Sequence, residues 1–486
     1  MATALTIAFR AATLALALGA AVPAAAQQSP ERQTLQQQVE SRLREAEPGT
    51  RFGLVVATQD GRELVAIAPD ARFIPASNTK MFITAAAFAT LPGLDRPDTS
   101  SGAAVRLEMD GGALPDVVLE GHGDARLSSA SDCAVNCLAA LADAVAARTR
   151  LVGDVVGDDS VYPDQRWSPG MSWNNMATRS GTAVSALSLD DNELHLRVAP
   201  TSPGRPPRLD LLPYYVVDNR AVTIAAGATN LDFERLPGSN VVRLTGTIAR
   251  GAEPELLRLA IDDPAHYAAW RFKALLEARG VRVTGAVAAR HRPPEPAADP
   301  GPRPAPLARL APPPLAEDLV LINKASQNLH AELMLRRLGR QSGTGSIADG
   351  LALVGAMLER AGVRRSDYDF SDGSGMSTYN RLAPRGVVRF LRWAEAQPWG
   401  AAWRATFPVG GVDGTLARRF RGTALESRLF AKTGSLNATA ALSGYMIARS
   451  GRTLHFSAYA NDTPDGAGDR ATAAIDAALL LIAERN

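Results

Sequence analysis

The sequence predicts an α/β protein of the α+β type, in which both ends of the chain build one antiparallel sheet flanked by helices. Three observations support this fold class: strand-like segments near the N-terminus, strand-like segments near the C-terminus, and a proline-rich stretch well inside the chain. The strand-like segments are residues 52–57 and 64–67, then 429–433, 438–447 and 453–459, and the proline-rich stretch is residues 292–314. We expect the long middle part to be an insertion into the domain that carries the sheet.

The two N-terminal segments form a predicted hairpin that leads into a helix. Residues 59–62, Gln-Asp-Gly-Arg, have the turn chemistry that joins two short antiparallel strands. Pro75, Ser77 and Asn78 then supply helix-start residues, and residues 81–91 are apolar enough for a helix that is buried on most sides.

The C-terminal strands are followed by a predicted last helix over residues 471–483. Its Ile475, Leu479 and Ile482 form an apolar stripe with few lysines or arginines beside it. Such a stripe is typical of a helix docked on a sheet and not of a membrane anchor.

The insertion spans about residues 93–304 and is predicted to contain β-dominated subdomains. It includes a helix-like stretch, residues 267–279, and a short strand after Gly280, but otherwise mostly short strands and turns. The main domain is then discontinuous and consists of residues 27–92 and 305–486.

The composition is that of an ordinary globular protein without a nucleic-acid signature. Of the 486 residues, 46% are apolar and 21% are charged, and the formal net charge is +2 without any basic stripe. We therefore expect no nucleic-acid partner.

Residues 1–26 are predicted to be an export signal that is cleaved near Ala26. Arg10 precedes the apolar run 11–22, and Ala24 to Ala26 provide the small residues of a cleavage site before Gln27. The alternative is an N-terminal membrane anchor, but the run is short for a span of about 20 residues, and no other segment is suitable.

Two cysteines, Cys133 and Cys137, lie four residues apart. In an exported protein this pair favours a local disulfide, although a regular helix would have to distort to allow the bond. A zinc site is disfavoured, because no partners with finger-like spacing lie nearby and the six histidines are scattered. We predict no metal and no cofactor.

Lysine is rare in this chain, and its placement indicates chemistry. Of the 52 basic residues only four are lysines, and three of these lie in short motifs with serines. A guanidinium cannot lose its proton in a protein, so lysine is required wherever a neutral amine must form.

Ser77 and Lys80 are three residues apart at a helix start, which suits a nucleophile and its base. Lowering the Lys80 pKa from about 10.4 to about 7.5 takes roughly 4 kcal/mol, which burial and a second cation such as Lys432 can supply together.

Two further polar motifs are candidates for the same site. Ser326 and Asn328 precede a predicted helix over residues 329–338, where a hydroxyl can relay a proton and a carboxamide can hold a substrate amide. An ordinary helix cap is the simpler explanation if this motif is considered alone.

The other motif, Lys432-Thr433-Gly434-Ser435, lies on a predicted strand. A strand edge can bind a peptide as an additional strand, and the lysine with the hydroxyls of Thr433 and Ser435 can hold a carboxylate. The alternative is that this strand is an ordinary edge of the sheet, where a charged lysine disfavours pairing with another chain.

With these motifs in the order Ser-x-x-Lys, Ser-x-Asn and Lys-Thr-Gly, the chain resembles the penicillin-recognising serine acyltransferases, which include penicillin-binding proteins and serine β-lactamases. The 249 residues from Ser77 to Ser326 narrow the resemblance to the D-alanyl-D-alanine carboxypeptidase/endopeptidases of the DacB type, the class C low-molecular-mass penicillin-binding proteins, which carry a large insertion there. Further stretches resemble that family: residues 121–124, 157–160, 185–189, 328–332, 372–375 and 411–416.

The resemblance implies catalytic roles for three residues. Ser77 is the expected acylated nucleophile, Lys80 its base and Ser326 a proton relay. The backbone N–H groups of Ser77 and Ser435 are the expected oxyanion hole.

The resemblance also implies that Asn328 anchors the substrate and that Lys432 and Thr433 bind its terminal carboxylate. One departure follows the Asp-Gly-Ser-Gly stretch: Met376-Ser377-Thr378 stands where related chains often have Leu-Ser-Arg. We expect this departure to alter contacts with the substrate but not the acylation step.

The implied fold is a transpeptidase domain like that of penicillin-binding proteins and serine β-lactamases. The implied function is that of a periplasmic serine DD-peptidase that hydrolyses D-Ala-D-Ala bonds of peptidoglycan stem peptides through an acyl-enzyme, with D-Ala–meso-diaminopimelate cross-links as a second target. β-Lactams are the expected inhibitors. Two alternatives are a β-lactamase, against which the insertion argues, and a non-catalytic wall-binding scaffold with the same fold.

Overall fold

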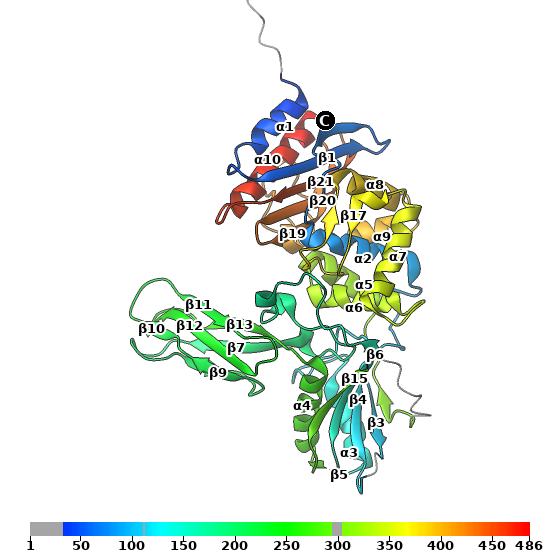
Figure 1. Cartoon of the computed structure of the whole chain (residues 1–486), viewed down its shortest axis with the longest axis vertical. Coiled ribbons are helices and arrows are strands. Elements are labelled where there is room, and N and C mark those ends of the chain that lie inside the picture. Colours follow the sequence, from blue (N-terminus) through cyan, green and yellow to red (C-terminus); the bar gives the residue numbers. More distant parts are fainter. Residues whose placement is uncertain (1–32, 110–111, 294–303) are drawn as a thin grey trace, which may run out of the picture.

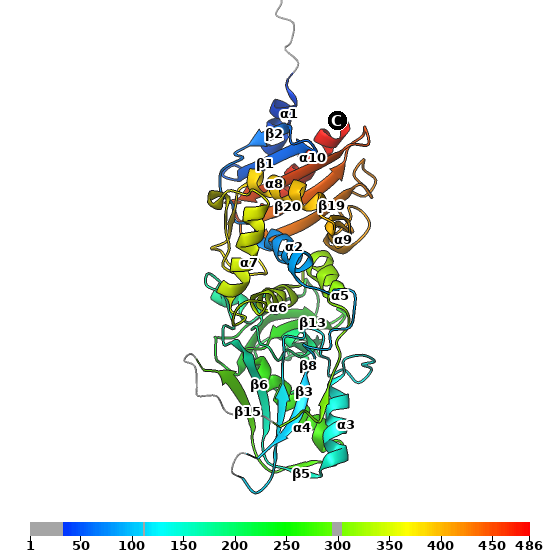
Figure 2. The same cartoon turned by 90° about the vertical axis from the view of Figure 1, so that its right-hand side faces the viewer.

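The computed structural model describes residues 33–109, 112–293 and 304–486 (Figure 1). The predicted export signal, residues 1–26, and the centre of the proline-rich stretch lie outside the described residues. The molecule is elongated, and one body contains both ends of the described chain while the middle of the chain extends away from it (Figures 1 and 2).

A five-stranded antiparallel sheet in the order β19-β20-β21-β1-β2 is the centre of that body. Val55 of β1 faces Ser457 of β21, so a strand from the start of the chain pairs directly with one from its end. The predicted assembly of the sheet from both chain ends is confirmed. The strands are β1 (Arg51–Thr58), β2 (Glu63–Ile67), β19 (Leu429–Leu436), β20 (Thr439–Ile447) and β21 (Thr453–Asn461).

Helices cover both faces of this sheet. On one face Leu442 of β20 packs with Ile475 of the last helix, as the apolar stripe predicts. On the other face Tyr445 of the same strand packs against the remaining helices, because successive side chains of a strand point to opposite faces. The first face carries α1 (Leu35–Leu43) and α10 (Gly468–Arg485), and the second carries α2 (Lys80–Thr90) and α8 (Pro384–Glu395).

A helical layer completes this body and fixes the position of α2. The ring of Phe82 of α2 lies 4.5 Å from that of Phe390 of α8 in a tilted arrangement, and Trp403 lies edge-on to Phe390. The fully buried aromatic rings hold α2 against its neighbours. The other elements of the layer are α5 (Leu315–Val320), a π-helical turn η5 (Leu321–Ala325), α6 (Asn328–Gly339), α7 (Ile347–Arg360), α9 (Gly400–Ala405) and the short pair β17 (Tyr368–Asp369) and β18 (Arg381–Leu382).

The middle of the chain forms further sheets with their own apolar core, and most of its elements are strands, as predicted. A mixed sheet in the order β15-β6-β4-β3-β16 is covered by two helices. Its parts are β3 (Ala104–Glu108), β4 (Asp116–Glu120), β6 (Val155–Pro163), β15 (Val287–Arg292), β16 (Ala308–Arg309), α3 (Leu138–Arg148) and α4 (Pro264–Glu277), with the short parallel pair β5 (Leu151–Val152) and β14 (Arg282–Val283).

A second group of strands projects to one side of this sheet (Figure 1). It consists of β7 (Glu193–Ala199), β8 (Arg208–Asp210), β9 (Val216–Asn219), β10 (Val222–Ile224), β11 (Asn230–Glu234), β12 (Val241–Ala249) and β13 (Glu255–Ala260). Because β16 pairs with β3, the returning chain still belongs to the mixed sheet at residue 309. The domain limits at 92/93 and 304/305 stay a prediction.

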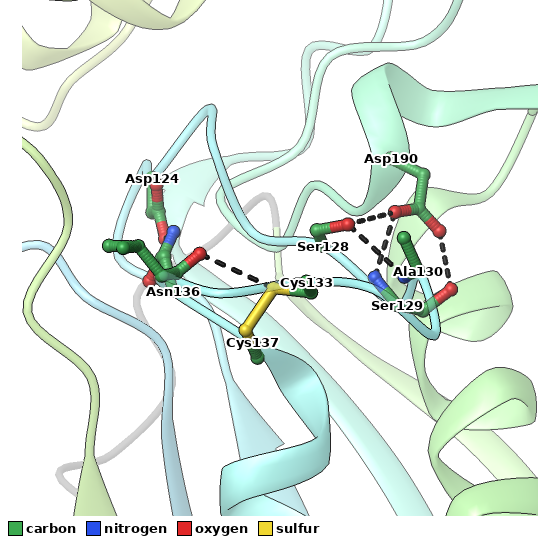
Figure 3. The surroundings of a disulfide bond; sticks show 9 residues. Asp124, Ser128, Ser129, Ala130, Cys133, Asn136, Cys137 and Asp190 are labelled. Carbon is green, nitrogen blue, oxygen red and sulfur yellow. Dashed lines mark hydrogen bonds between the residues drawn. A yellow bond between two sulfur atoms is a disulfide. The ribbon is translucent and has the colours of Figure 1, made fainter.

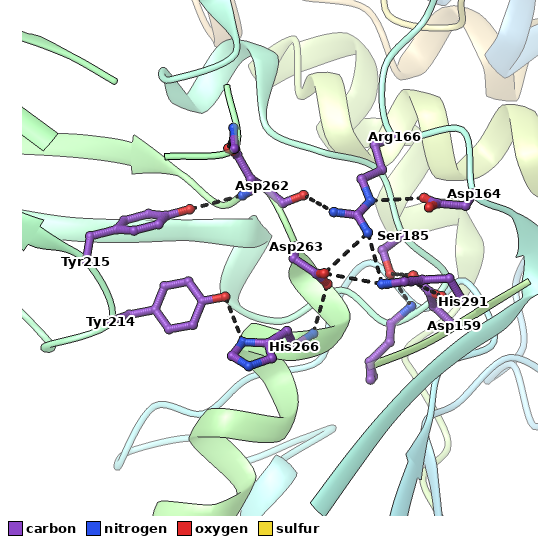
Figure 4. A network of polar contacts seen from close by, with 12 residues as sticks. Asp159, Asp164, Arg166, Ser185, Tyr214, Tyr215, Asp262, Asp263, His266 and His291 are labelled. Atoms are coloured by element: carbon purple, nitrogen blue, oxygen red, sulfur yellow. Dashed lines mark hydrogen bonds and ion pairs between the residues drawn. The ribbon is translucent and has the colours of Figure 1, made fainter. Parts of the chain in front are cut away.

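A polar network ties the mixed sheet to the start of α4 (Figure 4). The ring of His291 contacts Asp159 at 2.9 Å and Asp263 at 3.2 Å, and Asp263 also caps α4 by accepting the backbone N–H of His266. Hydrogen bonds to the two carboxylates raise the pKa of His291 to about 10. The histidine is therefore a cation that joins β15, β6 and α4.

Cys133 and Cys137 form a disulfide, which confirms the favoured prediction (Figure 3). No helix has to distort, because Cys137 is the N-cap of α3 and Cys133 lies in the preceding turn. Within the loop that the bond closes, Asn136 Nδ2 donates to Asp124 Oδ2 at 2.6 Å.

Candidate active site

Ser77 lies on a 3₁₀ turn, η1 (Ala76–Thr79), that runs directly into α2 at Lys80. The sequence predicted one helix start for both residues, and the tighter turn still brings Lys80 Nζ to 2.8 Å from Ser77 Oγ. Ala76, immediately before the serine, is buried and has a φ of 47°, in the left-handed region. Such backbone strain at a non-glycine residue is characteristic of functional sites.

The contacts of Lys80 Nζ fit the bonding pattern of a neutral amine. Two of them are acceptors only: Asn328 Oδ1 at 2.6 Å and the backbone carbonyl of Ser374. A neutral amine has two N–H donors for these oxygens and one lone pair, which can accept the O–H of Ser77. The geometry thus allows the serine to donate its proton to the lysine.

Burial explains why the amine can be neutral. The Lys80 side chain is completely buried, and this burial lowers its pKa to about 7 against the opposing pull of Asp372 and Glu332. Lys432, which the sequence suggested as a contributing cation, is itself completely buried. Burial, and then the charge of Lys80, hold the pKa of Lys432 well below its usual range.

Ser326 and Asn328 reach the site from an unusual turn. Ser326 is the C-cap that follows the π-helical turn η5, and its φ of 59° is left-handed; Gln327 then caps α6 by accepting the N–H of Leu329. The helix-cap explanation therefore applies to Gln327. Asn328 Nδ2 donates to the Ser180 carbonyl at 2.7 Å, which orients its Oδ1 toward Lys80.

Strand β19 forms the opposite side of the site. Lys432 Nζ donates to Ser326 Oγ at 2.9 Å and to the carbonyl of Thr433 at 3.0 Å. Asn78, next to Ser77, donates from Nδ2 to the Lys432 carbonyl at 2.8 Å and so fastens η1 to the strand. A Cβ at Gly434 would lie 2.5 Å from the Pro75 carbonyl, so only glycine allows this approach.

Thr433 and Ser435 lie at the open side of the site. Thr433 Oγ1 shares a hydrogen bond with Thr415 Oγ1 at 2.7 Å. Ser435 lines a pocket of about 490 Å³, which we name the Ser435 pocket; Ser180, Thr178, Met376 and Thr378 are among its other walls. Met376 and Thr378, which stand where related chains often have the Leu and Arg of Leu-Ser-Arg, thus line this pocket.

All seven predicted site residues lie in one region, and six of them are joined by two sets of contacts. Ser77, Lys80 and Asn328 form the first set, and Ser326, Lys432 and Thr433 form the second. Ser326 and Asn328 are two residues apart in the sequence and so connect the two sets of contacts. Ser435 lies three residues after Lys432 on strand β19.

Two acidic residues behind Lys80 received no role from the sequence. Glu332 Oε1 accepts the N–H groups of Gly373 and Ser374 at 2.9 and 2.8 Å. Asp372 accepts the N–H groups of Gly375 and Ser377 at 2.9 and 2.6 Å. Together they shape the turn that presents the Ser374 carbonyl to Lys80.

A sequence signal for one of these acids existed. Glu332 is four residues after Asn328 on α6, on the same face of the helix. Asp372 stands in an Asp-Gly-Ser-Gly stretch, which favours a turn in which the Asp side chain accepts nearby backbone N–H groups, but this local signal does not place the turn beside Lys80.

Neither a metal site nor a membrane span is found in the described part of the chain. Residues 33–109, 112–293 and 304–486 contain no cluster of three or more His, Cys, Asp or Glu that could hold a metal ion. Among the helices of the same residues, none combines the length and apolar character needed to cross a bilayer.

A serine held against a buried amine, beneath a five-stranded antiparallel sheet, defines the class of penicillin-binding proteins and serine β-lactamases. Penicillin-binding protein 4 (dacB) of Haemophilus influenzae superposes with a TM-score of 0.77 at 22% identity, over 91% of this chain and 98% of that one. Its structure with a novel β-lactam superposes with a TM-score of 0.72.

Sequence comparison gives the family. The profile of the D-Ala-D-Ala carboxypeptidase 3 (S13) family matches residues 35–482, and the chain belongs to this family of serine peptidases, which are hydrolases. The D-alanyl-D-alanine carboxypeptidase of Actinomadura sp. (strain R39) is 34% identical over 415 residues, covering 81% of this chain and 74% of that protein. The carboxypeptidase DacB of Haemophilus influenzae is 24% identical over 326 residues, covering 65% and 66%.

Proposed function

We propose that this protein is an exported serine DD-peptidase that hydrolyses the terminal D-Ala-D-Ala bond of peptidoglycan stem peptides through an acyl-enzyme. The observation that carries the proposal is the contact set of Lys80, in which one hydroxyl and two carbonyl oxygens surround a buried amine. An unactivated serine needs such an adjacent base. Membership of the D-Ala-D-Ala carboxypeptidase 3 (S13) family supports the same reaction.

In the first step Ser77 Oγ attacks the carbonyl carbon of the penultimate D-alanine while Lys80 Nζ takes the hydroxyl proton. The carbonyl oxygen becomes negative, and the backbone N–H groups of Ser77 and Ser435 stabilise it. Each donor of an oxyanion hole is typically worth about 3 kcal/mol. The peptide C–N bond then breaks and leaves an ester on Ser77.

Ser326 relays a proton to the leaving nitrogen. Its hydroxyl lies 2.9 Å from Lys432 Nζ, which keeps it oriented at the site. Water then attacks the ester, the O–H of Ser77 is restored, and the shortened peptide leaves with a new carboxylate.

Lys432 and Thr433 bind the terminal carboxylate of the substrate. A carboxylate beside a buried amine favours the charged form, so the substrate raises the lowered pKa of Lys432 as it binds. Asn328 anchors a substrate amide, because one hydrogen of its Nδ2 remains after the bond to Ser180.

β-Lactams acylate Ser77 in the same way and inhibit the enzyme. D-Ala–meso-diaminopimelate cross-links are a second substrate, since they contain the same D-alanyl carbonyl followed by a D-centre with a free carboxylate. The β-lactam complex of the Haemophilus influenzae structure supports the first of these assignments by likeness of fold.

The protein acts in the periplasm after cleavage of its export signal. The Cys133–Cys137 disulfide supports this location, because such bonds persist in oxidising compartments.

The test is to incubate the purified protein with fluorescent penicillin and with a muropeptide that ends in D-Ala-D-Ala. We expect a long-lived covalent label and release of D-alanine, and both are lost in Ser77→Ala while the melting temperature is kept. Rapid turnover of the drug instead indicates a β-lactamase. A protein that binds wall fragments but neither labels nor releases D-alanine contradicts the proposal and favours a scaffold.

A further inference from the structure

A second pocket adjoins the catalytic residues on the side of Ser326. It measures about 440 Å³ and shares Ser180 with the Ser435 pocket, but it reaches Ser326, Gln327 and Asn328 and not strand β19. We name it the Arg179 pocket, after the arginine of the short turn η3 (Arg179–Gly181) in its wall.

Most charges in the wall of the Arg179 pocket are already paired. Asp190 accepts the backbone N–H of Ser129 at 2.8 Å. Asp191 is bonded to the ring of His330 at 2.9 Å, and Arg126 lies 3.4 Å from Glu317. The Asp191–His330 and Arg126–Glu317 pairs neutralise their charges, whereas Asp190 is held by N–H and hydroxyl donors of Ser128 and Ser129.

Of the cations in this wall, Arg179 and Arg258 have no close hydrogen-bonded partner among the described residues, and both lie within electrostatic reach of one carboxylate of the wall, that of Glu193. Arg179 is exposed and makes no side-chain hydrogen bond or ion pair with any residue that the structure describes. The Arg258 side chain is 44% exposed and lies 3.7 Å from the carboxylate of Glu193, a distance that leaves its other donors free. The pocket therefore presents guanidinium groups that suit a carboxylate ligand.

The position of the pocket indicates which part of a substrate enters it. In the proposed reaction the reacting carbonyl lies at the N–H of Ser435, and the carboxylate of the leaving residue lies at Lys432 and Thr433. A chain attached to the leaving residue continues past Ser326, because Ser326 is bonded to Lys432 and also lines the Arg179 pocket.

A single D-alanine is too short to fill this space, whereas a cross-link has a long leaving group. When the D-Ala–meso-diaminopimelate bond breaks, the leaving amine is a complete second stem peptide with further carboxylates. We propose that the Arg179 pocket binds this second stem peptide, with Arg179 and Arg258 pairing with its carboxylates, and that it favours cross-linked substrates. The inference rests on the proposed function and deepens it by assigning a pocket and two arginines to the selection of cross-linked substrates.

The chemical step is the same for both substrates. The bond from Ser77 Oγ to the D-alanyl carbon forms, the amide C–N bond breaks, and the proton from Ser77 ends on the nitrogen of the leaving stem peptide. Water then hydrolyses the ester and restores Ser77, so no further reactant is needed.

The experiment compares a monomeric muropeptide that ends in D-Ala-D-Ala with a dimer joined by a D-Ala–meso-diaminopimelate bond. We expect Arg179→Gln to lower kcat/KM for the dimer roughly three- to tenfold further than for the monomer, mainly through KM, as for loss of one charge-assisted hydrogen bond. Arg179→Glu should lower kcat/KM for the dimer further, because it places a negative charge where the carboxylate would bind. Arg250→Gln, which removes an exposed arginine just after β12, is the matched control and should change neither substrate.

A dimer separates recognition by Arg179 from a structural effect if the carboxylates of its second stem peptide are amidated, except the one beside the scissile bond that Lys432 and Thr433 bind. Recognition predicts that parent and Arg179→Gln cleave this dimer equally well. If the Arg179 substitution instead disturbs Asn328 through its bond to Ser180, D-alanine release from the monomer should fall as much as cleavage of the dimer.

An unchanged ratio of dimer to monomer cleavage in both Arg179 variants overturns the inference, and so does a parent that cleaves only the monomer. If the parent neither reacts with penicillin nor releases D-alanine, the proposed function has failed and this inference falls with it.

Discussion

Arginine cannot replace the lysine at position 80. A guanidinium keeps its proton and is too large for the completely buried space between Ser77, Asn328 and Ser374. We expect Lys80→Arg to slow acylation by fluorescent penicillin about 10²- to 10⁴-fold, the usual contribution of a general base. Lys273→Arg is the control, because Lys273 only pairs with Glu277 at 3.9 Å on α4. Acylation of Lys80→Arg within a few-fold of the parent would rule out Lys80 as the base.

The lowered pKa of Lys80 sets the pH dependence of acylation. Below about pH 7 the amine is mostly protonated and cannot accept the Ser77 proton, so the rate should rise as the pH increases through about 7. Asp372 and Glu332 face the same amine and raise its pKa, so Asp372→Asn should move the midpoint to lower pH. Stopped-flow acylation between pH 5.5 and 8.5 measures the midpoint, and a flat profile would contradict this assignment.

The sequence predicted the principal site residues because each stands in a short motif with a chemical meaning. Ser77 and Lys80 are three residues apart, and that spacing alone places them on one face of a helix or a 3₁₀ turn. Asp372 could not be found in this way. It accepts backbone N–H groups of its own turn, those of Gly375 and Ser377, and local spacing does not show that this turn packs against Lys80.

At the level of elements, the turn after Asp372 packs closely against η1, the turn that carries Ser77. Gly375 has a φ of +85°, and a Cβ there would lie 2.0 Å from the Ala76 carbonyl. Gly375→Ala should therefore push Ser77 away from Lys80 and lower the acylation rate by about 10²-fold, as expected for a displacement of roughly 1 Å.

The matched control is Gly355→Ala on α7, where the nearest atom to the added Cβ is the Tyr368 hydroxyl at 3.7 Å. This change should keep acylation and stabilise the fold by about 0.5–1 kcal/mol, because alanine is the better helix residue. Penicillin labelling and calorimetry measure both quantities. Equal activity in the two variants would show that the turn does not position the serine.

The sequence predicted the strands of the main sheet and its last helix, but not the π-helical turn before Ser326. The spacing of apolar residues indicates which positions are buried and whether a segment is a helix or a strand. In residues 321–325 this spacing is that of an ordinary helix. The extra residue in the turn is held by tertiary bonds: Asn323 Nδ2 donates to the hydroxyls of Thr84 and Thr406 at 3.0 and 2.8 Å. Local sequence contains no information about such partners.

At the scale of the whole molecule, His291 links parts of the middle region in a way that depends on pH. Its folded pKa of about 10 lies above the ordinary value of 6.5, so the charged ring stabilises fully below pH 6.5 and this contribution is lost as the pH rises through 10. The groups that face it are Asp159, Asp263 and Arg166.

The difference in Tm between the parent and His291→Gln should therefore be larger at pH 6 than at pH 10. Calorimetry at the two pH values measures it, and His195→Gln, at a histidine with 58% side-chain exposure, is the control. A difference that is the same at both values would mean that His291 is not charged in the folded protein.

The limits of the inserted subdomains could not be drawn from the sequence. In the mixed sheet, Val287 of β15 pairs in parallel with Val155 of β6, and the two strands are separated by the whole side group of strands. Parallel strands are not joined by a hairpin turn, so no turn signal in the sequence indicates that they pair. Composition therefore predicted that the region is rich in strands, but not which strands are neighbours.

The pairing of β1 with β21 also has a consequence for biosynthesis. The ribosome releases β21 about 400 residues after β1, so the edge of the N-terminal hairpin stays open during nearly the whole of translation. Contacts between such distant segments form slowly and expose the nascent chain to aggregation. The core sheet can close only once the C-terminus has emerged, so we expect the chain to need a holdase chaperone until synthesis is complete.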